Sequence, residues 1–165
     1  MLFFEDLIKE NKAAFIARVN KMATFLGVKP DWLMFCFWFE TAHTMNSHIQ
    51  NKIGATGLIQ FLESTAIGLG TTTAALKVMS NVQQLEYVEK HLARFRGKYK
   101  SFVDLYCAIF WPAAVGQPDS YRITADKVAA QNPNFDINRD TDIEKSEIRA
   151  ALLKQIPIAY KHLFV

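Results

Sequence analysis

The chain has 165 residues, of which half are apolar and 13% are aromatic, and its formal net charge is +3. This length suits a single core, so we expect one domain over residues 1–165. The composition excludes a disordered chain. The scattered, weakly positive charge and the lack of a phosphate-loop or nucleic-acid motif argue against a nucleic-acid partner. No run reaches the roughly 20 apolar residues of a membrane span, so none is expected.

Apolar residues at helical spacing predict a mostly α-helical fold with one helix at its centre. The first predicted helix covers residues 2–26 and is ended by Gly27. Pro30 and Asp31 mark the start of a second helix over 31–43. This second helix is apolar almost all round, which is typical of a fully buried helix.

The rest of the chain predicts a polar loop followed by further helices. Residues 44–56 form the predicted loop, with a short hairpin as an alternative. Further helices are predicted over residues 64–70, 82–97, 102–111, 124–131 and 145–163. Asn81 and Ser101 are the expected caps of two of them, and Pro157 is expected to kink or break the last one.

Cysteines and histidines give no sign of a metal site. Cys36 and Cys107 lie in apolar helical stretches and are expected to be buried thiols, although a disulfide stays open as an alternative. The histidines lack the His-Glu-x-x-His spacing of zinc peptidases, so zinc is not expected. They are His43, His48, His91 and His162.

Glu40 is an unusual residue because it directly follows the apolar run at 32–39. Burial and the negative end of a helix dipole both favour the protonated form of a carboxyl group. A carboxylic acid that is still protonated near neutral pH is the general acid that glycosidic cleavage needs. The commoner alternative is a glutamate that is solvated or ion-paired at the helix end.

A second motif, Gly-Ala-Thr-Gly-Leu-Ile-Gln-Phe-Leu-Glu-Ser-Thr-Ala, occupies residues 54–66. Gly54 and Gly57 would let the backbone approach a ligand closely. The amide of Gln60 can donate to and accept from sugar hydroxyls, and Phe61 offers an apolar face to a sugar ring. The alternative is a tight turn leading into a helix, with Phe61 in the core.

Together these motifs resemble the soluble lytic transglycosylases. The resemblance consists of Glu40-Thr41, a polar loop, the Gly-Ala-x-Gly-Leu-Ile-Gln pattern at 54–60 and Ser-Thr-Ala at 64–66. Its strong part covers residues 31–70. The family shares a lysozyme-like fold with goose-type lysozymes and several phage cell-wall enzymes. The resemblance therefore implies a lysozyme-like fold whose central helix carries Glu40 as the single catalytic acid/base.

The resemblance also implies a cleft that binds peptidoglycan glycan strands. Thr41 stands where the family has serine, and Glu63 replaces the usual proline. The family's downstream Tyr-Asn-Ala-Gly is missing, and residues 105–116 stand in that region. The residues expected to bind substrate are Thr41, Gly57, Gln60, Phe61, Tyr106 and Trp111, with Phe110 as a further candidate for the aromatic wall.

The number of carboxylates sets the expected chemistry. Glycosidases usually employ a pair, but only Glu40 has motif support, and the other candidates are Glu63, Asp104 and Asp119. With one carboxylate, the N-acetyl group of muramic acid would assist, and the product would be 1,6-anhydro-muramic acid. Attack by water would instead make the chain a hydrolytic muramidase (an endolysin). A non-catalytic peptidoglycan-binding or virion structural domain is the third alternative.

Residues 136–147, Asp-Ile-Asn-Arg-Asp-Thr-Asp-Ile-Glu-Lys-Ser-Glu, follow the template of an EF-hand calcium loop. Thr141 stands at the usual glycine position, and Pro133 leaves the entering helix short or distorted. Some lytic transglycosylases carry a similar loop. We expect a structural calcium ion, and the alternative is an acidic helix start. The expected ligands are Asp136, Asn138, Asp140, Asp142 (through its backbone carbonyl) and Glu147.

The site of action is expected to be the bacterial cell wall, and the chain is expected to be a monomer. Glu5 and Asp6 lie where a secretory signal would be basic, and no cleavage site follows. No signal peptide is therefore expected, which favours release by lysis or delivery on a phage particle.

Overall fold

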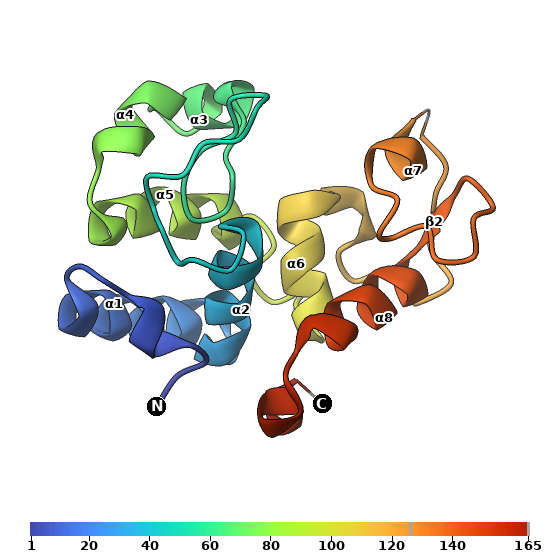
Figure 1. Cartoon of the computed structure of the whole chain (residues 1–165), viewed down its shortest axis with the longest axis horizontal. Helices are drawn as coiled ribbons and strands as arrows, with labels where there is room; N and C mark the ends of the chain where they lie inside the picture. Colours follow the sequence, from blue (N-terminus) through green and yellow to red (C-terminus); the bar gives the residue numbers. More distant parts are fainter. Residues whose placement is uncertain (126, 165) are drawn as a thin grey trace. The chain divides into compact units, whose positions relative to one another are not determined.

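The computed structural model describes residues 1–125 and 127–164 and is mostly helical, as the sequence predicts (Figure 1). These residues form two compact units, Met1–Gly97 and Lys98–Val165. The single domain over residues 1–165 and its lysozyme-like fold stay predictions. Within the described part of the chain, no helix is long and apolar enough to cross a membrane.

The first unit is built around a buried central helix. Its elements are η1 (Glu5–Leu7), α1 (Lys12–Leu26), α2 (Pro30–Glu40), α3 (Glu63–Gly68), α4 (Thr73–Val78) and α5 (Asn81–Ala93). Helix α1 packs against both α2 and α5 (Figure 1). All side chains from Leu33 to Trp38 are buried, so α2 is the apolar helix that the sequence predicts.

The predicted helix over residues 2–26 is wrong in its first part. Phe4 and Asn11 have positive φ angles of 48° and 49°, which a right-handed helix does not accommodate. The backbone N–H of Phe3 instead donates to the Asp31 carboxylate, at 2.8 Å. The chain therefore makes a short turn, η1, before α1 begins at Lys12.

Two details of the later helices in this unit also differ from the prediction. Helix α4 was not predicted, and the Thr72 hydroxyl caps it by accepting the Ala75 N–H at 3.0 Å. Helix α5 is capped by Ser80 in a reciprocal capping box with Gln83, rather than by Asn81.

The second unit combines short helices with a minimal antiparallel sheet. Its elements are α6 (Phe102–Phe110), η2 (Pro112–Ala114), β1 (Arg122–Ile123), α7 (Val128–Gln131), β2 (Ile143–Glu144), α8 (Lys145–Gln155) and η3 (Ile158–Leu163). Helix α6 packs against α8 (Figure 1). In the sheet, Arg122 lies opposite Glu144 and Ile123 opposite Ile143.

Several predictions for this unit are confirmed and others are corrected. Ser101 caps α6, and Pro157 separates α8 from η3. The predicted helix 124–131 shrinks to α7, because Lys127 has a φ of 67° directly before it; residue 126 of that prediction lies outside the described residues. Neither strand was predicted.

Both cysteines are free and buried. The structure therefore decides between the two alternatives in favour of thiols. Burial raises the pKa of the Cys107 thiol to about 12, so this group is protonated and unreactive at neutral pH.

Candidate functional site

Glu40 is the last residue of α2, where that helix leaves the core. Pro30 occupies the first turn, where its missing N–H costs no hydrogen bond. The next residues drive the helix through the core, and the side chains at 33–38 are all buried. Glu40 is half-buried. Glu40 is thus a half-buried acid at the end of a buried helix.

The turn after Glu40 is held by Thr41. The Thr41 hydroxyl donates to the Phe37 carbonyl at 2.7 Å and accepts the Met45 N–H at 2.9 Å. Ala42 and His43 then adopt positive φ angles of 50° and 68°, so the helix ends three residues before the predicted 43. Thr41 is fully buried. It therefore shapes the turn beside Glu40, and its implied contact with substrate stays a prediction.

The glycine-containing motif folds into a tight, bridged loop. Thr56 pairs with both Gln50 and Phe61 in isolated β-bridges, which corresponds to the hairpin alternative. Gly57 is buried and has a φ of 86°, and a Cβ there would lie 2.5 Å from Oε1 of Gln84. Gly57 is thus explained by a neighbouring side chain, whereas the prediction assigned it to a ligand.

Gln84 is a residue that sequence reasoning missed. Its fully buried amide accepts the Leu58 N–H at 3.0 Å and donates to the carbonyls of Ser47 (2.6 Å) and Leu76 (2.8 Å). It therefore ties the loop to α4 and α5. The sequence did contain one sign of this role: Gln84 is a polar residue one helical turn before Val88, on the apolar stripe of α5.

The two remaining predicted residues of the loop have different environments. Phe61 is only 2% exposed and packs edge-on against the His91 ring. This burial matches the alternative that Phe61 lies in the core, and its contact with a sugar ring stays a prediction. Gln60 is half-buried, and its Nε2 donates to the Gly57 carbonyl at 3.0 Å. The side-chain oxygen of Gln60 makes no hydrogen bond within the described residues, so it can accept from a ligand.

Glu63 serves as a link between two short helices. Its carboxylate accepts the hydroxyl and the backbone N–H of Thr73, the first residue of α4. These two hydrogen bonds lower the pKa of the Glu63 carboxyl below its ordinary value. Glu63 therefore holds α4 against the start of α3, and its oxygens are used for that purpose.

The other two candidate carboxylates are paired within the second unit. Asp104 is buried, and its Oδ1 lies 2.5 Å from Nζ of the buried Lys145. Burial favours the neutral acid, but hydrogen bonds from Lys145, Gly116 and Lys100 outweigh it and hold the pKa of Asp104 below its ordinary value. Asp119 accepts two hydrogen bonds from the Arg149 guanidinium, at 2.8 and 3.0 Å.

The predicted aromatic wall also lies in the second unit. Tyr106 is buried against the rings of Phe110 and Phe135. It therefore lies in the core, and its binding to substrate stays a prediction. Trp111 caps the end of α6 and is half-buried, so part of its indole reaches solvent.

The predicted calcium loop closes on its own side chains. The Asp136 carboxylate accepts the N–H groups of Asp140 and Thr141, at 3.1 and 3.3 Å. Glu147 accepts those of Ile137 and Asn138, both at 3.0 Å. Thr141 has a φ of 74°, the conformation that favours the glycine of the template. The loop thus has the backbone turn that the template requires.

A cation of the chain itself already contacts this loop. The Arg122 guanidinium lies 2.6 Å from Asp140, 3.4 Å from Asp142 and 3.1 Å from Glu144. Within the described residues, no three His, Cys, Asp or Glu side chains are grouped so as to hold a metal. Calcium binding at 136–147 therefore stays a prediction.

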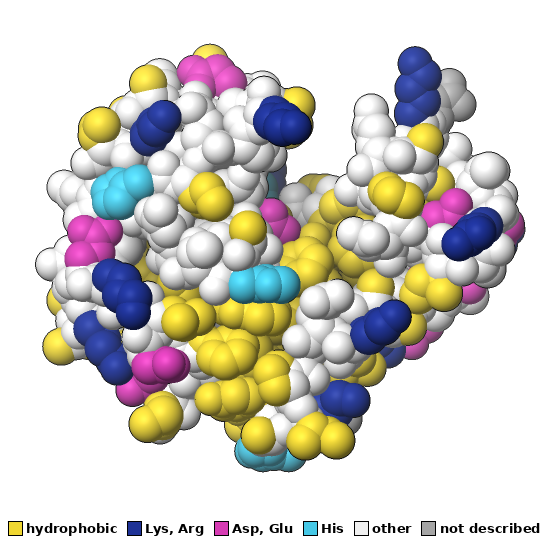
Figure 2. All heavy atoms as spheres, in the orientation of Figure 1, with side chains coloured by type: hydrophobic (Ala, Val, Ile, Leu, Met, Phe, Trp, Pro, Cys, Tyr) yellow, Lys and Arg dark blue, Asp and Glu magenta, His cyan; other side chains and the backbone are white. Residues whose placement is uncertain are grey.

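The charged side chains can be followed on one face of the molecule. On the face shown in Figure 2, lysine and arginine side chains lie scattered among apolar and acidic ones instead of forming one basic patch. No family model, curated protein or solved structure matches the chain. The resemblance to soluble lytic transglycosylases therefore rests on the sequence at 40–41 and 54–66.

Proposed function

We propose that the chain cleaves the β-1,4 glycosidic bond between N-acetylmuramic acid and N-acetylglucosamine in peptidoglycan, as a lytic transglycosylase. The position of Glu40 carries this proposal. It is a half-buried carboxyl group at the end of a helix that is buried over residues 33–38. A half-buried acid at the carboxyl end of a helix is the type of group that general-acid catalysis employs.

In the proposed reaction Glu40 acts twice. It first protonates the glycosidic oxygen, while the substrate's own N-acetyl oxygen stabilises the positive charge at C1 of muramic acid. As a carboxylate it then removes the proton of the muramyl 6-hydroxyl, and O6 bonds to C1 to close the 1,6-anhydro ring. The carboxyl group is protonated again at the end, and no water is consumed. Gln60, which keeps a side-chain oxygen available, would orient the sugar beside it.

The engagement of the other candidate carboxylates supports a single acid/base. Glu63 is tied to Thr73, Asp104 to Lys145 and Asp119 to Arg149. To act as a general base or nucleophile, each of these carboxylates would have to give up its present partner.

A non-catalytic peptidoglycan-binding or virion structural domain is the second candidate. The observation that favours it is that Thr41, Gly57 and Phe61 are buried and have internal packing roles. The Glu40 motif and the loop could then be retained for folding alone. For either function, the proposed site of action is the bacterial cell wall, reached after lysis or on a phage particle, with the chain as a monomer.

The test compares two matched variants, Glu40→Gln and Glu63→Gln, on purified peptidoglycan. Each replaces a carboxyl group by an amide of nearly the same shape. We expect Glu40→Gln to lower the release of soluble muropeptides at least about 100-fold, with unchanged circular dichroism, and Glu63→Gln to retain activity. Activity of Glu40→Gln within about tenfold of the unmodified chain would refute the catalytic assignment. Equal co-sedimentation of both chains with inactive cell walls would then favour the binding domain.

We also propose that the loop at 136–147 binds one structural calcium ion. The side-chain oxygens of Asp136, Asn138, Asp140 and Glu147 and the carbonyl of Asp142 are the hard ligands that calcium prefers. The positive φ of Thr141 supports the proposal. The ion would hold the loop onto α8 and would take no part in the proposed cleavage.

A further inference from the structure

The first unit contains a polar pocket whose lining does not include Glu40. Its volume is about 460 Å³, within the usual range for ligand pockets. Three segments that are distant in sequence form it: the N-terminal residues Leu7, Lys9 and Glu10, the loop 44–48, and Asn81 at the start of α5.

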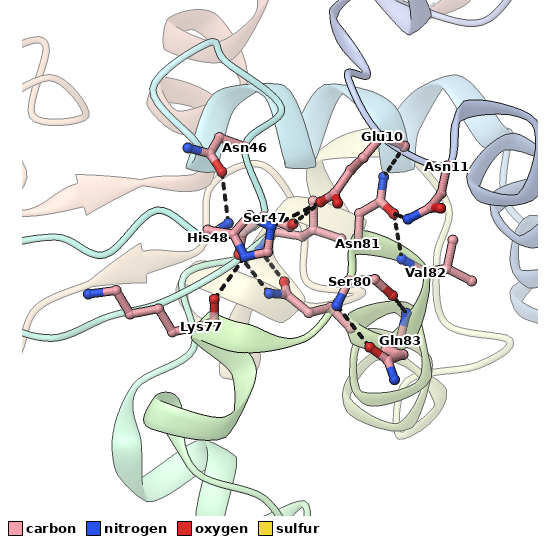
Figure 3. A network of polar contacts seen from close by, with 12 residues as sticks. Glu10, Asn11, Asn46, Ser47, His48, Lys77, Ser80, Asn81, Val82 and Gln83 are labelled. Atoms are coloured by element: carbon pink, nitrogen blue, oxygen red, sulfur yellow. Dashed lines mark hydrogen bonds and ion pairs between the residues drawn. The ribbon is translucent and has the colours of Figure 1, made fainter.

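The walls of this pocket are fixed by hydrogen bonds. Asn81 is only 3% exposed. Its Nδ2 donates to the Glu10 carbonyl at 2.7 Å, and its Oδ1 accepts from the Asn11 amide at 3.3 Å. Figure 3 shows this amide joining the N-terminal segment to α5. The pocket is therefore largely formed before a ligand arrives, which limits the ordering cost of binding.

One of the two oxygens of the Glu10 carboxylate contacts neighbouring residues of the pocket. Oε1 of Glu10 accepts from the Ser47 hydroxyl at 3.2 Å and lies 3.1 Å from Nε2 of His48 (Figure 3). The other ring nitrogen of His48 lies 2.8 Å from the Lys77 carbonyl. These contacts hold Glu10 in place with its second oxygen, Oε2, making no hydrogen bond within the described residues.

Two other residues that line the pocket keep donors available. Asn46 uses its side-chain oxygen to accept the His48 N–H at 2.9 Å, which leaves its amide NH₂ without a partner in the described part of the chain. The Lys9 ammonium likewise makes no ion pair with any described residue. The pocket thus presents an acceptor, an amide donor and a cation to a bound molecule.

We propose that this pocket is an accessory binding site for an N-acetylated hexosamine of a glycan strand. A lysine and a carboxylate offset one another, which favours a neutral ligand. Carboxylate and amide groups pair with hydroxyl and acetamido groups, while Leu7 and Met45 offer apolar contact to the ring. The choice of this sugar among neutral polar ligands rests on the proposed function. The pocket would hold a second stretch of the strand that Glu40 cleaves.

The probe is the trisaccharide of N-acetylglucosamine, titrated into the full-length Glu40→Gln variant and followed by amide NMR shifts. We expect shifts at residues 7–10 and 44–48 with a dissociation constant of about 1 mM, because no Phe, Tyr or Trp ring is among the lining residues. Adding Glu10→Gln should weaken binding at least about fivefold, and adding Lys9→Gln should weaken it less. The control is Glu86→Gln, an exposed acid of α5 outside the pocket, which should leave binding unchanged.

The outcomes separate this proposal from the catalytic one. Pocket shifts that depend on Glu10 support the accessory site even if the unmodified chain fails to cleave peptidoglycan. Shifts confined to residues near Glu40 and Gln60, or pocket shifts that are indifferent to both Glu10→Gln and Lys9→Gln, would overturn it. Melting curves of the two pocket variants establish that a lost shift reflects the site and not unfolding.

Discussion

Gly54 and Gly57 share one backbone conformation but have different surroundings. Both have a φ of 86°, yet a Cβ on Gly54 would meet nothing within 4 Å. A Cβ on Gly57 would collide with the Gln84 amide, which is fixed by hydrogen bonds to Leu58, Ser47 and Leu76. The pair therefore separates the cost of backbone strain from the cost of displacing a buried amide.

We predict that Gly54→Ala lowers the free energy of unfolding by about 1 kcal/mol, from backbone strain alone. Gly57→Ala should cost about 2–3 kcal/mol more, because the buried amide loses hydrogen bonds that nothing replaces. Urea unfolding of both variants measures the difference. Equal losses for the two alanines would mean that Gln84 shifts freely, contrary to its role as the tie of the loop.

Asp104 and Lys145 form the buried ion pair of the second unit. Removing one partner leaves the other charge buried, so we expect Asp104→Asn to lower the free energy of unfolding by about 3–5 kcal/mol at pH 7. Asp119→Asn is the control, because its exposed pair with Arg149 should contribute less than about 1 kcal/mol. Losses of similar size in these two variants would contradict a special role for the buried pair.

Asp104 also makes the stability of the folded chain depend on pH. The pKa of Asp104 is lowered in the folded chain. Its contribution to stability is therefore fully present above the ordinary aspartate pKa of about 4. It is lost as the pH falls through the lower pKa of the folded state. Urea unfolding between neutral pH and the acid range should show this loss in the unmodified chain and a shallower one in Asp104→Asn.

Single residues differ in how far the sequence reveals them. Glu40 could be located because a carboxylate directly after an apolar run is visible locally. Gln84 was not assigned a role, because two of its partners, Leu58 and Ser47, lie 26 and 37 residues away. Asn81 was assigned only as a helix cap, because its partner, the Glu10 carbonyl, lies 71 residues away. Thr41, Phe61 and Tyr106 were assigned to a substrate by resemblance, whereas their burial follows from packing that a motif does not encode.

At the scale of elements, the sequence predicted the helix ends that are set by neighbouring residues. The Ser101 cap and the break at Pro157 depend on neighbouring residues and are confirmed. The pairing of β1 with β2 joins two-residue strands about 20 residues apart, so no periodicity could reveal it. The false start of the helix at 2–26 has a similar cause, because its apolar residues are held by contacts such as that between Phe3 and Asp31.

The loop at 136–147 should respond to calcium through Glu147. Stabilisation should grow with free calcium, by roughly 2.7 kcal/mol at a hundredfold excess over the dissociation constant. Magnesium should substitute poorly, because it prefers a tighter six-coordinate shell. Thermal melting with calcium, magnesium or chelator measures the effect, and Glu147→Ala should remove it.

Arg122 supplies the sharper control for this site. It pairs with Asp140 and Asp142, so it competes with any bound cation. Arg122→Gln should therefore lower the stability of the calcium-free chain but strengthen its response to calcium. A melting temperature indifferent to calcium and chelator in both chains would show that the acidic run only starts α8 and pairs with Arg122.

At the scale of the whole molecule, composition and periodicity were sufficient for the mostly helical class and for α2 as the buried helix. The division into two compact units at Gly97 was not predicted. It depends on which segments contact one another, and a pattern of apolar residues specifies only that each helix has a buried face. The polar pocket has the same origin, since residues 7–10, 44–48 and 81 meet only in the folded unit.

Whether water enters the product distinguishes a lytic transglycosylase from a muramidase. If Glu40 works alone, the 6-hydroxyl of muramic acid closes the ring and the released muropeptides are one water molecule lighter than hydrolysed ones. Digestion of peptidoglycan in ¹⁸O-labelled water, followed by mass spectrometry, should then give 1,6-anhydro ends without label. Labelled reducing ends throughout would identify a muramidase, in which a water molecule takes the place of the 6-hydroxyl. Glu63→Gln would then show whether Glu63 leaves Thr73 to activate that water, because only in that case would labelled product disappear.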